Sequence, residues 1–329
     1  MHAAIRTPHA SHDRRKALIT GGQYAPRVGL SRRTLITGSA ILGGAGGLGL
    51  WGLLADARLI PGRSVVDTLF GRCDITSEPA EAEPGRVLRA SFFSSRRKRT
   101  VRYLIAYPPN VAAGAPLPVC LFLHGHGGDA TDLEEFGYHR MLAGAVAAGV
   151  PPFVLAAVDG GDRYWHPRGD GDDPLHMLLD DFPVVLAQHG LPVTRLAVLG
   201  ISMGGFGALL ARTEAPARFV AVAATAPAFW FSFDEAQDAS PGAFDSAEDW
   251  LTWGDLRPRT EHLAGNKVRI DCGAADPFEP NLRTLRSQLP DQSVVNVSAG
   301  CHDGAFFRAV APAQLKLIGE ALAAPPTPT

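Results

Sequence analysis

The pattern Gly-x-Ser-x-Gly at residues 200–204 constrains this chain more than any other stretch. Residues 196–199 form an apolar run typical of a buried strand, and the segment after the pattern, rich in Ala and Leu, favours a helix. In that setting the turn strains the backbone of Ser202 and exposes its hydroxyl. We expect Gly200 and Gly204 there because a Cβ at either position would collide with the opposite arm of the turn. The pattern therefore predicts a nucleophilic serine, with the N–H groups of the following helix directed at charge that develops beside it.

Predicted strands and helices alternate along the rest of the chain. The predicted strands span residues 86–94, 100–107, 117–123, 153–158, 196–199, 219–224, 268–271 and 293–297. The predicted helices span residues 131–148, 175–188, 281–288 and 306–323, in addition to the segment after Ser202. This alternation predicts an α/β fold with a mostly parallel central sheet flanked by helices. The basic run Arg96-Arg97-Lys98-Arg99, between the first two strands, is interpreted as a solvated hairpin turn.

Residues 225–264 interrupt the alternation before the seventh predicted strand. This segment concentrates aromatic side chains, namely Phe229, Trp230, Phe231, Phe233, Phe244, Trp250 and Trp253. A long aromatic connection predicts an excursion that covers a pocket at the carboxyl edge of the sheet, where such folds bind ligands. The alternative is a small satellite core. By position, Trp165 and Trp230 are candidate substrate-binding residues, although Trp165 suits a structural plug beneath its loop better.

Residues 1–57 differ in composition from the remainder and predict an export signal or a membrane anchor. Ser31-Arg32-Arg33-Thr34-Leu35-Ile36 resembles a twin-arginine signal, a glycine-rich uncharged run follows, and Ala55-Asp56-Ala57 suits signal-peptidase cleavage. The twin-arginine export machinery is then an expected partner, and the protein is expected in the periplasm, cell envelope or medium. A plain secretory signal and an uncleaved membrane attachment are the alternatives. Residues 58–85 are interpreted as a linker or N-terminal extension, and residues 324–329 as a disordered tail.

Cysteine usage and net charge bear on compartment and partners. The four cysteines are Cys73, Cys120, Cys272 and Cys301, and some of them are expected to pair in an exported protein. Cys272 and Cys301 lie at corresponding ends of the last two predicted strands, so we expect a disulfide between them; two buried thiols are the alternative. The formal net charge of −2 gives no electrostatic ground for a nucleic-acid partner.

A nucleophilic serine needs a base and an acid, and candidates for both follow Ser202 in the chain. His302, before the last predicted helix, is the only histidine after residue 262. Asp276 lies in the loop beyond strand 268–271 and can reach a histidine there, whereas Asp271 lies within the strand end and is the second choice. We therefore predict a triad in which His302 takes the proton of Ser202 while Asp276 orients and stabilises the imidazolium.

The loop His124-Gly125-His126-Gly127-Gly128-Asp129, after strand 117–123, is the predicted source of an oxyanion donor. We expect the backbone amides of His126 and Met203 to form the pair, each contributing roughly 3 kcal/mol to lowering the barrier. A zinc cluster built on His124-x-His126 and Asp129 is disfavoured, because the Asp is displaced by one position and Ala130 stands where a further His is needed.

With these motifs the chain resembles the esterase branch of the α/β-hydrolases. That branch includes the S-formylglutathione hydrolases (esterase D), the feruloyl esterases and the antigen 85 mycolyltransferases. The resemblance covers about residues 86–323 and rests on the motifs at 124–126 and 200–205, on Asp276 and on His302. Residues 159–166 and the helix near 177–185 also look like this branch. The resemblance implies an α/β-hydrolase catalytic domain with a Ser–acid–His site and neither metal nor organic cofactor, and it leaves the acyl group open.

We therefore expect an exported carboxylesterase that acts through an acyl-Ser202 intermediate on a small-molecule or carbohydrate-linked ester. Acyl transfer to a sugar hydroxyl, as in the mycolyltransferases, is the nearest alternative, because both reactions use the same serine turn. An alternative from another class is a catalytically silent module that binds envelope glycans or a protein. Labelling of Ser202 by a fluorophosphonate separates that module from an enzyme.

Overall fold

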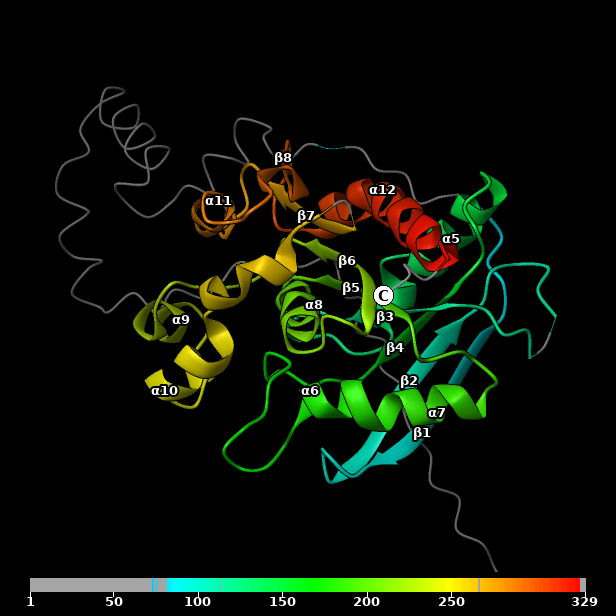
Figure 1. The fold of residues 1–329 in the computed structure, drawn as a ribbon, viewed down its shortest axis with the longest axis horizontal. Helices are drawn as coiled ribbons and strands as arrows, with labels where there is room; N and C mark the ends of the chain where they lie inside the picture. The colour runs from blue at the N-terminus through cyan, green and yellow to red at the C-terminus, as the bar shows by residue number, and fades with distance from the viewer. Residues whose placement is uncertain (1–72, 74, 76–81, 113, 266, 326–329) are drawn as a thin grey trace, which may run out of the picture.

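The computed structural model describes residues 73, 75, 82–112, 114–265 and 267–325 (Figure 1). The predicted export segment, most of the predicted linker and residues 326–329 lie outside the described residues. Among the residues described, no helix combines the length and apolar character needed to cross a membrane.

A sheet of eight strands forms the centre of the fold, in the order β1-β2-β4-β3-β5-β6-β7-β8. The strands are β1 (Val87–Ser94), β2 (Arg99–Ala106), β3 (Val119–Leu123), β4 (Val154–Val158), β5 (Leu196–Ile201), β6 (Phe219–Thr225), β7 (Val268–Gly273) and β8 (Val295–Ser298). The pairs β1–β2 and β2–β4 are antiparallel, and all the others are parallel. The predicted mostly parallel α/β sheet is confirmed.

Helices cover both faces of this sheet. They are α4 (Asp132–Glu135), α5 (Tyr138–Ala147), α6 (Pro174–His176), the π-helix η1 (Met177–Asp181), α7 (Phe182–Gln188), α8 (Met203–Glu214), α9 (Phe233–Ala239), α10 (Ala247–Asp249), the π-helix η2 (Trp250–Gly254), the 3₁₀ helix η3 (Arg257–Leu263), α11 (Glu279–Arg286), the 3₁₀ turn η4 (Gln292–Val294) and α12 (Gly304–Ala323). In β3, Leu121 and Leu123 pack in the core with α7 and α8, whereas Cys120 and Phe122 pack in the core with α5 and α12. The central strands are continuously apolar because both of their faces are buried.

The predicted helix over 131–148 is interrupted in the structure. Gly137 has a φ of +80° and separates α4 from α5. Only glycine adopts this left-handed conformation without steric cost, so the sequence itself sets the break. The helix after the last strand begins at Gly304, where the side chain of Asp303 accepts a hydrogen bond from the N–H of Phe306 at 2.9 Å.

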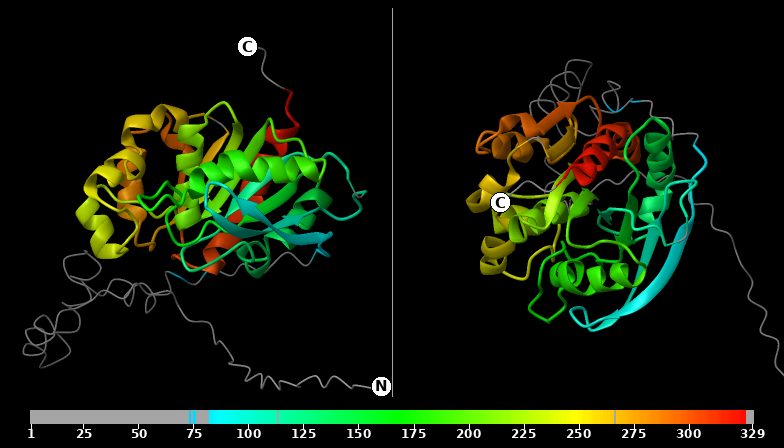
Figure 2. Two further views of the ribbon diagram at one scale, coloured as in Figure 1. Left: turned by 90° about the horizontal axis from the view of Figure 1, so that it is seen from below. Right: turned by 45° about the vertical axis from the view of Figure 1, so that its right-hand side comes forward.

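The aromatic excursion at 225–264 folds into short helices beside α8. Figures 1 and 2 show α9 and α10 at the end of the molecule away from β1 and β2. Four aromatic residues of the excursion, Phe229, Trp230, Phe244 and Trp250, are buried and belong to the core that includes α7 and α8. These aromatics therefore extend the main core, rather than forming the separate satellite core of the alternative interpretation.

The basic hairpin between β1 and β2 differs from prediction at Arg97. This residue is only 4% exposed, and its Nε and Nη2 donate to the two carboxylate oxygens of Asp172, both at 2.8 Å. Its Nη1 donates to the carbonyl oxygen of Asp159 at 2.7 Å. The prediction of a solvated turn is wrong for Arg97, because a buried carboxylate from a distant loop compensates its charge. Arg96 and Arg99 remain exposed.

Candidate active site

The turn that carries Ser202 joins β5 directly to α8. Ser202 has φ 54° and ψ −118°, a conformation that L-residues rarely adopt. Its N–H donates to the carbonyl of Thr225 at 2.8 Å, and its carbonyl accepts from the N–H of Ala228 at 3.1 Å. The end of β6 thus holds the strained backbone in place, which is the usual arrangement where strain persists at a functional site.

The two flanking glycines of the pattern are required for different reasons. A Cβ on Gly200 would lie 2.0 Å from the carbonyl oxygen of Gly204, on the opposite arm of the turn, as predicted. A Cβ on Gly204 would instead lie 2.1 Å from the carbonyl oxygen of Leu123 in β3. The expectation for Gly204 is therefore corrected: the neighbouring strand, rather than the turn, excludes a side chain there.

The structure brings Ser202, His302 and Asp276 together. The distance from Ser202 Oγ to His302 Nε2 is 2.8 Å, and that from His302 Nδ1 to Asp276 Oδ2 is 2.7 Å. The other oxygen of Asp276 accepts the N–H of Phe278 at 2.8 Å, which fixes the carboxylate. A serine, a base and a group that orients the base within hydrogen-bond distance form the arrangement that activates a hydroxyl for attack.

Asp271, the second choice for the acid, points elsewhere. Its Oδ2 accepts from Arg269 Nε at 2.8 Å and from Gln314 Nε2 at 2.7 Å. Asp276 lies three residues beyond the end of β7 and is 2% exposed. The loop position thus allows Asp276 to reach His302, whereas the strand position directs Asp271 toward α12.

The electrostatics of the site raise the pKa of His302 above its usual value of 6.5. Burial disfavours the charged ring and by itself would lower the pKa. The charge of Asp276, the hydrogen bond with it and the charge of Asp303 outweigh that effect. The imidazolium formed when His302 accepts a proton is therefore stabilised by its neighbours.

The predicted oxyanion donors lie on the two segments that flank Ser202. Met203 is the first residue of α8, so its backbone N–H belongs to the first turn, where helix N–H groups have no partner within the helix. Across from it, a Cβ on Gly125 would lie 3.6 Å from the Cβ of Ser202, which places the loop containing His126 against the serine. The role of the two amides as oxyanion donors stays a prediction.

The candidate substrate residues Trp165 and Trp230 are both buried. Trp165 is 0% exposed and fills the space where a Cβ on Gly160 or Gly207 would stand, which agrees with a plug beneath the loop. Trp230 is 3% exposed and packs edge-to-face on Phe278, with ring centroids 5.6 Å apart. Neither indole is open to a substrate in this structure.

Two aromatic residues that the sequence did not single out flank the histidine. The ring centroids of Phe278 and Phe307 lie 5.3 and 5.5 Å from that of His302. The signal was present in both cases: Phe278 follows Asp276 by two residues, and Phe307 lies in the first turn after the histidine loop.

The predicted disulfide between Cys272 and Cys301 is wrong. Cys301 is bonded to Cys73, and Cys272 is a buried free thiol. Cys272 packs in the core that includes α11, whereas Ile75, two residues after the bonded Cys73, packs against the core of α5 and α12. Cys272 thus packs within β7 in one core layer, whereas Cys301 lies three residues beyond the end of β8 and bonds a segment that packs on the other layer.

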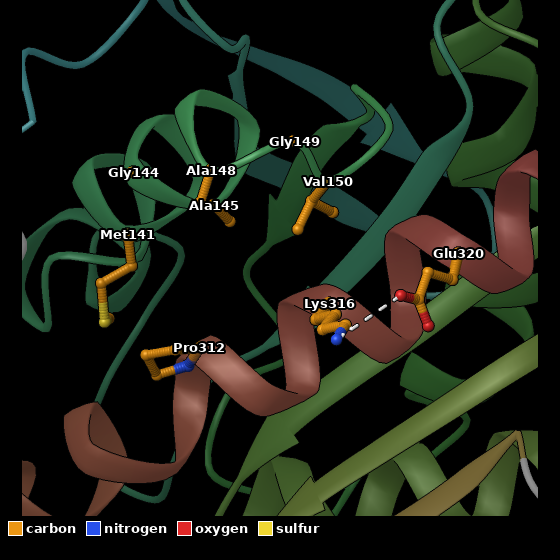
Figure 3. Close-up of a pocket in the computed structure, with 9 residues that line it drawn as sticks. All are labelled: Met141, Gly144, Ala145, Ala148, Gly149, Val150, Pro312, Lys316 and Glu320. Atoms are coloured by element: carbon orange, nitrogen blue, oxygen red, sulfur yellow. Dashed lines mark ion pairs between the residues drawn. The ribbon is translucent and has the colours of Figure 1, made fainter.

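A groove between α5 and α12 lies apart from these residues (Figure 3). Its lining comprises Met141, Gly144, Ala145, Ala148, Gly149, Val150, Pro312, Lys316 and Glu320. Lys316 and Glu320 pair across one helical turn at 3.9 Å. The lining contains no Ser, Thr, Cys or His side chain, and its two charged groups pair with each other, so we do not assign it to the site. Within the part of the chain that the structure describes, no group of three His, Cys, Asp or Glu side chains could hold a metal ion.

Comparison with known proteins places the fold among esterases. A ferulic acid esterase matches with a TM-score of 0.60 and 18% identity, over 73% of this chain and 100% of its own. An S-formylglutathione hydrolase from Agrobacterium tumefaciens matches with a TM-score of 0.58 and 19% identity, over 75% of this chain and 98% of its own. The fluorophosphonate-binding serine hydrolase F of Staphylococcus aureus matches with a TM-score of 0.57 and 16% identity, over 72% of this chain and 99% of its own. At these identities the likeness concerns the fold. Comparison with curated proteins finds no match.

Sheet order, serine turn and the hydrogen-bonded serine, histidine and aspartate together define a hydrolase of the α/β class. The family to which the chain belongs is a narrower group within this class. Residues 94–292, more than half of the chain, match the family model described as "Putative esterase", and the chain belongs to that family.

Proposed function

We propose that this chain is an exported serine carboxylesterase that forms an acyl-Ser202 intermediate. The observation that carries the proposal is the continuous hydrogen-bond series from Ser202 through His302 to Asp276. Membership of the esterase family supports ester chemistry. The substrate class is a small-molecule or carbohydrate-linked ester.

In the first half-reaction, Ser202 Oγ attacks the ester carbonyl while His302 Nε2 takes its proton. The carbonyl oxygen becomes an oxyanion, for which the N–H groups of His126 and Met203 are the expected donors. When the tetrahedral intermediate collapses, the bond to the alcohol oxygen breaks. His302 then returns the proton to that oxygen, so the alcohol leaves neutral and the acyl group stays on the serine.

In the second half-reaction, water takes the place of the alcohol. His302 accepts a proton from the water as its oxygen attacks the acyl carbon, and returns it to Ser202 Oγ as the acid departs. Asp276 stays ionised throughout and stabilises the imidazolium. Each proton removed is returned, and the net reaction consumes one water per ester.

Export is supported by the bond between Cys73 and Cys301. Disulfides persist mainly in oxidising compartments outside the cytosol. The twin-arginine-like segment that would direct export lies outside the described residues, and the export machinery remains a proposed partner.

The test is hydrolysis of a chain-length series of p-nitrophenyl esters by the wild-type chain and by Ser202→Ala. We expect turnover by the wild type and a loss of at least ~10⁴-fold in kcat for the variant, with the far-UV circular dichroism unchanged. A fluorophosphonate should label the wild type at Ser202 and leave the variant unlabelled. Turnover by Ser202→Ala equal to that of the wild type, or the absence of labelling in the wild type, would overturn the proposal.

A further inference from the structure

His124 has no assigned role in the reaction, yet its imidazole is buried at the start of the loop that lies against Ser202. It follows β3 directly and is 1% exposed. A buried imidazole is costly unless both ring nitrogens have partners. Here both do, since Nδ1 lies 2.8 Å from the carbonyl oxygen of Gly125 and Nε2 lies 2.9 Å from the backbone nitrogen of Gly160.

These two partners fix the tautomer of His124. The Gly125 carbonyl can only accept, so Nδ1 carries the proton. The Gly160 N–H can only donate, so Nε2 carries a lone pair. Burial lowers the pKa of His124, although the charges of Asp159, Asp162 and Asp129 and the hydrogen bond with Gly125 partly oppose this effect. The neutral ring suits both contacts, whereas protonation of Nε2 would place its N–H against the N–H of Gly160 with no acceptor between them.

The carbonyl that His124 holds belongs to the same peptide unit as the N–H of His126. A trans peptide is planar, and its C=O and N–H point in opposite directions. Fixing the direction of the Gly125 oxygen therefore fixes the direction of the His126 N–H. This N–H is the predicted oxyanion donor, and the Gly125 backbone lies against Ser202.

The surrounding turn is held at its other peptide units as well. The N–H of Gly125 donates to Asp132 Oδ2 at 3.3 Å, and the N–H of Gly127, whose φ is +78°, donates to Asp162 Oδ1 at 2.5 Å. The N–H of Gly128 also donates to the Gly125 oxygen, at 3.2 Å. The Gly125 oxygen thus accepts from both His124 and the N–H of Gly128. Loss of the His124 side chain should therefore loosen the Gly125–His126 peptide rather than unfold the loop.

We propose that His124 is a positioning residue that orients the Gly125–His126 peptide, and through it the His126 N–H, for stabilisation of the oxyanion. The inference rests on the proposed esterase function. It assigns a task to a buried side chain that acts through a backbone amide. A preorganised donor contributes most when its direction is set before the charge develops.

Two substitutions separate the two hydrogen bonds of the ring. In His124→Asn the side-chain NH₂ can stand where Nδ1 stands and keep the bond to the Gly125 carbonyl. In His124→Gln the amide oxygen can stand where Nε2 stands and keep the bond to the Gly160 N–H. If orientation of the Gly125–His126 peptide matters, Asn should retain kcat within about fivefold and Gln should lose about 10- to 100-fold.

Acylation and deacylation both pass through an oxyanion, so the Gln variant should lose kcat while its KM changes less than twofold. Its rate constant for fluorophosphonate labelling should fall by a similar factor. His189→Gln removes a ring that bonds Tyr103 and serves as the matched control; it should leave kcat unchanged. Melting temperatures of all variants, measured in parallel, separate a general loss of folding from a specific loss of catalysis.

The inference is supported if Gln loses kcat, Asn retains it and the two variants melt within a few degrees of each other. Equal kcat in Asn, Gln and wild type would overturn it, and so would equal losses in Asn and Gln that follow their melting temperatures. A wild type without esterase activity or labelling would instead refute the proposed function, so the two failures are distinguishable.

Discussion

At the scale of the residue, the imidazole of His302 lies between partners with opposite requirements. Its Nδ1 needs a proton to bond Asp276, and its Nε2 must be free of one to receive the proton of Ser202. The neutral ring protonated on Nδ1 meets both conditions. The protonated ring meets only the first, so the reaction is expected to stop as the ring becomes charged.

We therefore expect kcat/KM to decrease as the pH is lowered, with a midpoint above 6.5. Burial lowers the pKa of His302, but the charge and hydrogen bond of Asp276 and the charge of Asp303 raise it further than burial lowers it. A raised pKa means that the ring is already protonated at pH 6.5, so the active form accumulates only at higher pH. The pH profile of ester hydrolysis measures this midpoint.

Two variants test the cause of that midpoint. Asp276→Asn removes the main raising charge and should move the midpoint to lower pH while reducing kcat by ~10⁴-fold. Asp303→Asn is the matched control, because asparagine can still cap α12. Its pH midpoint should shift less than that of Asp276→Asn, and its kcat should be retained. A wild-type midpoint below 6, or an unmoved midpoint in Asp276→Asn, would contradict the assignment.

At the scale of the element, the segment after β4, residues 159–173, links three parts of the molecule. Asp159 accepts the N–H of Ala130 at 2.7 Å and so reaches the predicted oxyanion loop. Asp172 binds Arg97 of the β1–β2 hairpin. Arg168 donates to Asp245 at 2.6 Å, which ties the segment to the aromatic excursion. These contacts are polar and buried or half-buried, so the loss of one partner would leave the other buried without its hydrogen bond.

The pair of Arg97 and Asp172 should be the most sensitive of these links. Both side chains are 3% exposed. Arg97→Met leaves the Asp172 carboxylate buried without its main partner, so we expect the free energy of unfolding to fall by about 3–5 kcal/mol. Urea denaturation followed by circular dichroism measures the change.

Arg99→Met provides the comparison on the same hairpin. Its side chain is 56% exposed and its distance to Asp172 is 3.3 Å, so its loss should cost less than about 1 kcal/mol. Equal losses in the two variants would show that burial does not distinguish the two arginines.

At the scale of the whole molecule, the disulfide joins segments 228 residues apart. It ties residue 73 to the residue that precedes His302, so it connects the N-terminal part of the chain to the loop of the candidate base. Cross-links of this length restrict the unfolded chain strongly in the chain-entropy model. The bond therefore affects both the global stability and the anchoring of one loop.

We expect Cys73→Ser to lower the free energy of unfolding by about 2–5 kcal/mol, measured by urea denaturation without reductant. Dithiothreitol should lower the stability of the wild type to that of the variant. It should leave the variant itself unchanged, because Cys120 and Cys272 are already free thiols. A reductant effect of equal size in the variant would show that this disulfide is not its cause.

The sequence by itself determined the mostly parallel sheet and the serine turn, because strand periodicity and glycine at a crowded turn are local properties. The order of Ser202, Asp276 and His302 along the chain predicted them as a triad, and the structure places the three side chains within hydrogen-bond distance. Only the tertiary structure decided that Cys301 bonds Cys73, that Arg97 is buried and that His124 holds the Gly125 carbonyl. Each of these depends on which distant segment lies opposite a given side chain. Neighbouring strands end together, but the layer that each side chain faces is set by packing across the whole sheet.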